Sequence, residues 1–110
     1  EAINYYQQAI QAKNDYATAY FNLALLYSEK NDIEKTILNY KEALRIKPDS
    51  SEVHNNLGVA LAVQGKLKEA IKHFRIALEL DPGSVDGHYN LKKALTLMNT
   101  LMYLCLLQLL

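Results

Sequence analysis

The chain has a single cysteine, Cys105, in 110 residues. One cysteine excludes an internal disulfide framework and any metal site that needs several cysteines. The sequence also lacks an HExxH or CxxC spacing and a glycine-rich phosphate loop, so we expect neither a bound metal nor a cofactor. No histidine or cationic residue neighbours Cys105 in the sequence to activate its thiol, which indicates an inert apolar side chain rather than a nucleophile.

An excess of charge of either sign is also missing. Twelve basic residues balance twelve acidic residues, which leaves a formal net charge of zero. A chain without net charge is not expected to bind nucleic acid or a membrane surface through bulk electrostatics. The lone cysteine indicates no redox compartment, and the cytoplasm is favoured without any motif that specifies it.

A helical hairpin is the clearest pattern that the sequence does contain. It runs from Ser51 to Ser84, and its apolar or small residues recur at helical spacing. Gly65 suits the left-handed conformation that ends a first helix, and Asp81-Pro82-Gly83 cannot continue a second one. The stretch therefore predicts a helix, a turn, a second helix and a stop. The residues that set the spacing are Leu57, Gly58, Leu61 and Ala62 in the first half, and Leu67, Ala70, Ile71, Phe74, Ala77 and Leu78 in the second.

The hairpin repeats with a period of 34 residues. Residues 17–50 aligned with residues 51–84 share seven identical positions, where chance would give roughly two or three. The identical pairs are Asn22/Asn56, Leu23/Leu57, Ile37/Ile71, Ala43/Ala77, Leu44/Leu78, Pro48/Pro82 and Ser50/Ser84. A repeat of this length predicts a chain built from successive, similar hairpins.

The repeated hairpin resembles the tetratricopeptide repeat (TPR) family in the residue types at fixed slots. In the later hairpin these slots hold His54, Leu57-Gly58, Leu61, Ala70, Phe74 and Pro82, and in the earlier one Tyr20, Leu23-Ala24, Tyr27, Thr36, Tyr40 and Pro48. Small residues let the two helices approach closely, and aromatic residues fill the gap to the next hairpin. His54 and His88 share the slot of Tyr20, where the family usually has an aromatic residue, so both are interpreted as structural. His73 is expected to be solvated.

The resemblance implies an all-α fold of stacked antiparallel helix-turn-helix hairpins, a right-handed α-solenoid. We expect one TPR domain over residues 1–110, and because Glu1 starts inside a repeat we interpret the chain as a fragment of a longer repeat protein. The expected segments are 1–16, the second helix of a truncated repeat; 17–50 and 51–84, complete repeats; and 85–110, a degenerate repeat or a capping helix with an apolar tail. The number of repeats in the parent protein is not predicted.

The fourth segment departs from the repeat at two positions. Lys92 and Leu104 both stand in slots where the two complete hairpins have smaller residues. Large residues at a helix crossing argue against an ordinary fourth hairpin, so we expect Val85 to about Met98 to cover the preceding hairpin as a capping helix. Asn99 shares the turn slot of Asn31 and Gly65, and therefore predicts a left-handed turn after that helix.

The last ten residues, Leu101 to Leu110, are apolar on every helical face and are expected to form a helix from about Thr100. Three interpretations stay open: the tail packs on a partner or a second copy, it begins a membrane span, or it is foreign sequence from an altered reading frame. The uncharged run from Ala94 is at the lower limit of the ~17–25 residues of a spanning helix, so packing on another chain is favoured. A homo-oligomer contact would use Leu101, Leu104, Leu107 and Leu110.

Three asparagines mark the predicted peptide-binding groove. Asn22, Asn56 and Asn90 lie 34 residues apart, each directly before the packing leucine of a first helix. First helices line the concave face of TPR proteins, so the resemblance implies a ladder of amides; the alternative is that the asparagines only cap or solvate. A carboxamide both donates and accepts, and can bind the backbone of an extended peptide. The same face is expected to carry Phe21, Leu25, Asn55, Val59 and Tyr89.

This pattern favours a non-catalytic protein-interaction scaffold that binds a peptide segment of an unidentified partner. One alternative is the substrate-guiding arm of a larger enzyme, because the Asn-Leu-Ala and Asn-Leu-Gly runs resemble the superhelix of O-GlcNAc transferases; the other is a self-association module. TPR adaptors of the large heat-shock chaperones hold a C-terminal carboxylate with Lys, Arg and Asn. Phe21, Glu52 and Asn90 stand at the slots where those cations would lie, so chaperone-tail binding is not expected.

Overall fold

The computed structural model describes residues 1–12 and 17–110, and there it consists of helices without a strand. The expected all-α fold is confirmed. Residues 13–16, which include the predicted end of the first segment, lie outside the described residues. The helices are α1 (Ala2–Ala12), α2 (Ala17–Glu29), α3 (Ile33–Ile46), α4 (Ser51–Val63), α5 (Leu67–Leu80) and α6 (Val85–Gln108).

The turns within the two complete hairpins have the same left-handed geometry. Asn31 between α2 and α3 has a φ of 60°, and Gly65 between α4 and α5 has a φ of 88°. In both turns the N–H of the next residue donates to a carbonyl five positions earlier, from Asp32 to Tyr27 at 3.0 Å and from Lys66 to Leu61 at 2.9 Å. These bonds satisfy carbonyls that the end of a helix leaves free. The left-handed turn is confirmed at both positions.

The residue that caps α4 after the loop between the two hairpins is Ser50, and not Asp49, the acidic residue before it. Ser50 caps α4, and its hydroxyl accepts a hydrogen bond from the Val53 N–H at 3.3 Å. Ser84 caps α6 in the same way, accepting from the Gly87 N–H at 3.0 Å. The loops therefore repeat a Pro-x-Ser pattern in which the serine satisfies a free N–H of the first helical turn.

The two helices of the second hairpin meet where a glycine faces an aromatic ring. Gly58 on α4 lies against Phe74 on α5, and a Cβ added to Gly58 would lie 2.7 Å from Phe74 Cδ1. Ala70 is fully buried beside this crossing, and Leu57 and Leu61 are fully buried on the same helix as Gly58. The absence of a side chain at Gly58 lets the helices approach closely enough to bury these residues.

The last helix is continuous, which corrects the expected turn. Asn99 lies inside α6 in helical conformation, and among the described non-glycine residues only Asn31 has a positive φ. The reason lies in the neighbouring slots: Lys92 and Leu104 are exposed, whereas the buried Ala24 and Ala70 stand in the corresponding positions. Without small residues to receive a returning helix, a turn at Asn99 would gain no packing, and the helix continues.

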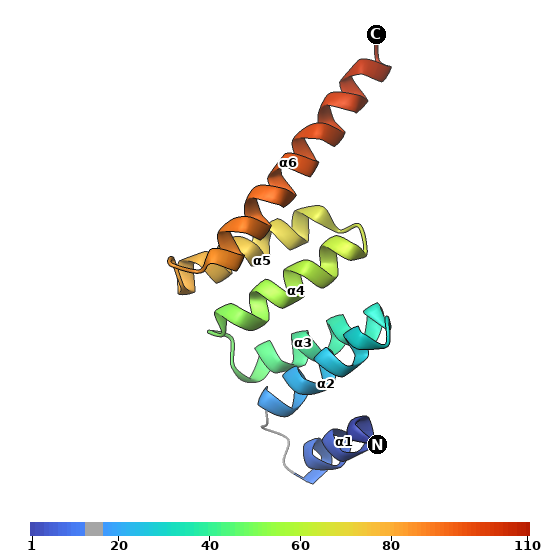
Figure 1. Ribbon diagram of the computed structural model, residues 1–110, viewed down its shortest axis with the longest axis vertical. Helices are drawn as coiled ribbons and strands as arrows, with labels where there is room; N and C mark the ends of the chain where they lie inside the picture. Colours follow the sequence, from blue (N-terminus) through green and yellow to red (C-terminus); the bar gives the residue numbers. More distant parts are fainter. Residues whose placement is uncertain (13–16) are drawn as a thin grey trace.

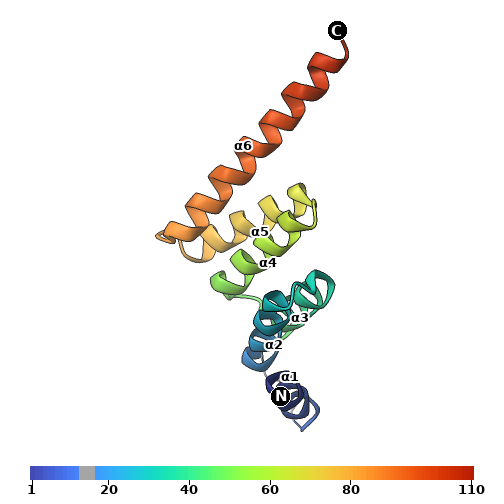
Figure 2. The ribbon, with the colours of Figure 1, turned by 45° about the vertical axis from the view of Figure 1, so that its right-hand side comes forward.

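The helices stack in chain order into an elongated molecule with principal extents of 58 × 28 × 19 Å. Each helix packs on its neighbours in the sequence, and α4 also contacts α6. Figures 1 and 2 show α1 at one end of the stack and the second half of α6 projecting beyond α5 at the other. Within the described residues, none of the helices combines the length and apolarity needed to cross a membrane.

Candidate functional site

The first helices of successive units, α2, α4 and α6, share a face that contains four hollows. Two hollows of about 270 and 240 Å³ lie between α2 and α4, with α3 as their floor. Two more of about 240 and 280 Å³ lie between α4 and α6. We call this surface the first-helix face. Its hollows repeat because the units that form them repeat.

The hollows between α2 and α4 contain the predicted groove residues of the first complete unit. Asn22 and Phe21 line one hollow together with Glu52. Leu25 lines the other, together with Asn56 and Val59 from α4. Asn22 and Asn56 are half-buried, so each amide is partly accessible from solvent.

The hollows between α4 and α6 contain two further predicted residues, Asn90 and Asn55. Asn90 and Val59 line one of them, and Asn55 and Asn56 line the other. Tyr89 lines none of these four hollows; its ring is 63% exposed, and the Lys93 Nζ lies 5.9 Å from the ring centre. The structure therefore brings seven of the eight predicted residues to the hollows, with Tyr89 outside them.

Two of the three ladder asparagines also contact side chains of their own chain. The Asn90 amide N–H donates to the Asn55 carbonyl oxygen at 3.1 Å, which joins α6 to α4. The Asn56 side chain lies beside Tyr40 in a hollow between α2 and α4. Burial raises the pKa of the Tyr40 phenol, because desolvation outweighs the lowering by Asn56, and Glu52 adds to the increase. Asn56 and Asn90 therefore contact neighbouring helices as well as lining the face.

The charges around the hollows are mixed and slightly acidic. Lys47 and Lys93 are the basic residues that line them, and Glu52, Asp81 and Asp86 are the acidic ones. The acidic residues gather in the hollow between the N-terminal ends of α4 and α6, beside Asn55 and Asn56. A peptide on such a surface would meet amide groups and apolar side chains, but no cluster of cations.

A pair of histidines lies on α4 and α5, the two helices of the second complete hairpin. The expectation that His73 is solvated is wrong. His73 is half-buried on α5 and stacks on the buried His54 of α4, with ring centroids 5.3 Å apart. The His54 Nε2–H donates to the Pro48 carbonyl at 2.9 Å, so its Nδ1 is the acceptor in the 3.0 Å contact with His73 Nδ1–H. His88 makes the same bond to the Pro82 carbonyl at 2.8 Å, because both histidines stand six residues after the proline of their loop.

Neither histidine belongs to a metal cluster in the part of the chain that the structure describes, where no three His, Cys, Asp or Glu side chains converge on a common point. The pKa of His73 is lowered first by burial, then by His54 and by Lys72, with Glu69 opposing and Lys41 of α3 contributing least. These surroundings therefore favour the neutral state of the His73 ring.

Acidification is expected to destabilise the chain through His73. Above its ordinary pKa of 6.5 the ring is neutral in both the folded and the unfolded states. Below that value the unfolded chain takes up a proton that the folded chain resists, so the free energy of unfolding falls as the pH falls through 6.5. Thermal melts followed by circular dichroism at pH values on both sides of 6.5 measure this change.

Two variants separate this effect from the general titration of the chain. His73→Gln keeps a donor for His54 without a titrating ring, and its melting temperature is expected to fall less on acidification than that of the natural chain. His88→Gln is the matched control for the loss of a histidine, because His88 makes the same backbone bond but has no histidine partner. Equal pH dependence in all three proteins would contradict the assignment to His73.

Comparison with known proteins gives two family models and a set of solved structures. Residues 51–84 match the model described as "Tetratricopeptide repeat", and residues 25–65 match the model described as "TPR repeat". Together the two models span residues 25–84, more than half of the chain. None of the curated proteins searched matches the sequence.

The similar solved structures are TPR domains. The TPR domain of Arabidopsis OM64 is 26% identical with a TM-score of 0.79, over 84% of this chain and 76% of that domain. The second TPR domain of human RPAP3, in complex with the HSP70 peptide SGPTIEEVD, is 27% identical with a TM-score of 0.80, over 84% and 77%. The first TPR of Spaghetti (RPAP3), bound to the HSP90 peptide SRMEEVD, shares the fold at 21% identity and a TM-score of 0.85, over 88% and 77%.

Proposed function

Because the chain belongs to the tetratricopeptide repeat family, we propose that it is a non-catalytic scaffold whose first-helix face binds an extended peptide segment of a partner protein. The observation that carries the proposal is the repetition of the face itself. An asparagine occurs at the same slot of three successive first helices, beside hollows of about 240 to 280 Å³. An extended peptide presents donors and acceptors along its backbone, and amides at regular intervals can pair with both.

The apolar residues of the face support the same function. Phe21, Leu25 and Val59 line hollows beside the asparagines, where apolar side chains of a peptide would be removed from water. Asn22 is the amide most available to a ligand, because Asn56 and Asn90 also contact Tyr40 and Asn55. The proposed recognition therefore combines backbone hydrogen bonds with side-chain pockets.

The charges of the first-helix face favour peptides that are not acidic. The HSP70 and HSP90 peptides in the similar structures both end in Glu-Glu-Val-Asp. Three carboxylates and two ammonium groups line the face of this chain, so an acidic peptide end would meet net repulsion. We propose that a neutral peptide with apolar side chains binds more tightly than either chaperone peptide.

Alanine substitution of the asparagines tests the function. Peptides selected on the chain from a random library are titrated by calorimetry, with SGPTIEEVD as the acidic comparison. Asn22→Ala is expected to weaken the selected peptide by about 0.5–1.5 kcal/mol, the net contribution of a neutral hydrogen bond. The melting temperature should not change. Asn56→Ala and Asn90→Ala should weaken binding similarly and also lower the melting temperature slightly, because their contacts with Tyr40 and Asn55 are lost.

Asn99→Ala is the matched control, because this exposed amide on α6 lines none of the four hollows. It should bind the peptide as the natural chain does. Raising the salt to about 0.5 M should change affinity little, since the proposed contacts are uncharged. Binding that survives the triple Asn22, Asn56 and Asn90 substitution but is abolished by salt would contradict the amide ladder and assign binding to charged residues.

A further inference from the structure

The apolar face with which α6 packs on the preceding hairpin continues along the half of α6 that projects beyond the other helices. Leu91, Ala94, Leu95 and Met98 pack α6 against the core of the preceding hairpin. At a spacing of three and four residues, the same face continues through Leu101, Met102, Cys105 and Leu109 on the projecting half of the helix. Figure 1 shows that this half extends past the N-terminal end of α5, so of the other helices only the start of α5 lies near these later residues.

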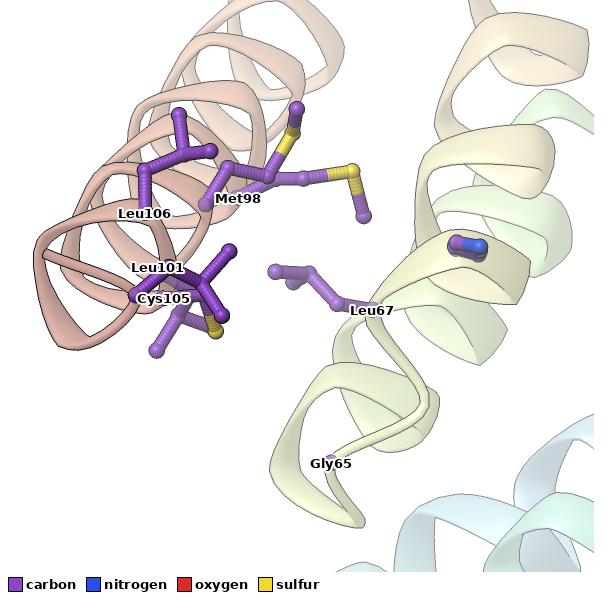
Figure 3. Close-up of a pocket in the computed structure, with 9 residues that line it drawn as sticks. Gly65, Leu67, Met98, Leu101, Cys105 and Leu106 are labelled. Atoms are coloured by element: carbon purple, nitrogen blue, oxygen red, sulfur yellow. The ribbon is translucent and has the colours of Figure 1, made fainter.

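An open cleft of about 600 Å³ lies between this part of α6 and the start of α5. Its α6 wall consists of Met98, Leu101, Met102, Cys105, Leu106 and Leu109, which we call the cleft face. The opposite wall is formed by Gly65, Leu67 and Lys68. Figure 3 shows Leu67 pointing from α5 toward Met98 and Leu101 across the cleft. Lys68 carries the one charge among the residues that line it.

The surface that the tail exposes is large for a monomer. Between Leu101 and Leu110 the large apolar side chains are 48% to 102% exposed. If a fully exposed side chain of this size offers roughly 150–200 Å², they leave on the order of 900 Å² in water. This exceeds the ~300–600 Å² of the largest apolar patch on a typical monomer, and it is comparable to the ~800 Å² that each partner contributes to a standard interface.

We propose that a second copy of this chain fills the cleft. The two α6 helices would pack antiparallel along their cleft faces, and Leu67 of each copy would contact the projecting helix of the other. A two-fold arrangement supplies the uncharged second half of one α6 and one largely apolar cleft from each copy, so both surfaces are buried at once and the assembly closes as a dimer. The residues from Ala94 to Leu110 carry no charge that would oppose this pairing.

The paired helix takes the place that the second helix of a fourth hairpin would occupy. That hairpin is blocked within the chain by Lys92 and Leu104, which are exposed on a continuous α6. A helix from another copy does not need a turn at Asn99 and approaches along the cleft face instead. The first-helix face on α2, α4 and the start of α6 stays free in this dimer. The dimer therefore does not depend on the proposed function.

A matched pair of leucine substitutions tests the dimer. Leu101 is 55% exposed and lies on the cleft face, while Leu107 is 48% exposed and, by its helical position, lies on the side of α6 away from the cleft. Sedimentation velocity of the 110-residue chain without detergent is expected to show a dimer at high micromolar concentration. Leu101→Lys should raise the dissociation constant at least tenfold, equivalent to about 1.4 kcal/mol, and Leu107→Lys should leave the dimer in place.

Circular dichroism checks that both variants keep the helix, and peptide binding should be the same in all three proteins. A monomeric natural chain at high micromolar concentration overturns the proposal, and so does equal loss of the dimer in Leu101→Lys and Leu107→Lys. A monomer that sediments with phosphatidylcholine vesicles would assign the tail to a membrane surface. Open-ended aggregation in place of a closed dimer would contradict the two-fold arrangement.

Discussion

Replacing Gly58 with leucine is expected to lower the free energy of unfolding by about 1–3 kcal/mol, the usual cost of overpacking a close contact. A Cβ at this position would lie 2.7 Å from Phe74 Cδ1, and the remaining atoms of leucine have no space between α4 and α5. Leucine favours a helix over glycine by roughly 0.8 kcal/mol, which offsets only part of this cost. The melting temperature should fall by about 4–8 °C for each kcal/mol lost, as measured by circular dichroism or calorimetry.

Gly83 provides the matched control for this substitution. It lies in the loop before α6, where the nearest atom to an added Cβ is the Asp81 Oδ1 at 3.8 Å, and Gly83→Leu should change the melting temperature little. Combining Gly58→Ala with Phe74→Leu should recover part of the stability that Gly58→Ala alone loses, because the smaller side chain makes room. An unchanged melt of both Gly58→Leu and Ala70→Leu would mean that the pairing of α4 with α5 is wrong.

Truncating the buried leucine of the second hairpin is expected to have the largest effect. Leu57 has 0% exposure, and Leu57→Ala should cost about 2–5 kcal/mol because it removes buried methyl groups and leaves a cavity. Leu38→Ala makes the same chemical change on α3 at a side chain that is 65% exposed, and should stay within about 0.5 kcal/mol. Denaturant unfolding of both variants measures the difference. Similar losses would contradict the assignment of the core to the face of α4 that contains Leu57.

The regular part of the fold could be predicted from the sequence because the repeat imposes the same constraints twice. Asn31 and Gly65 share a slot and adopt the same left-handed turn. The small residues Ala24 and Ala70 are fully buried, and Gly58 lets α4 and α5 approach closely, as the resemblance implied for small residues. Each of these features depends on a residue type at one position, so the sequence alone was enough to predict it.

Features that depend on two distant residues could not be predicted in the same way. The contact between His54 and His73 joins α4 to α5, and the bond between Asn90 and Asn55 joins α6 to α4. Asn99 has the residue type of a turn, but no packing rewards a returning helix after it, so α6 continues. The amides of the candidate site were identified from their common slot, while their partners within the chain depend on how closely the helices approach one another.

The order of contacts between the helices determines how the molecule opens. The end helix α1 packs only on α2, whereas α4 packs on α3, α5 and α6, in the substantial contacts among the described helices. Opening an end helix therefore breaks fewer contacts than opening the middle, and local unfolding is expected to start at the ends and to reach α4 last. A peptide along α2, α4 and α6 would touch three units that otherwise open separately. Its binding energy would then oppose each of these local openings, so the ligand would make the unfolding of the stack more cooperative.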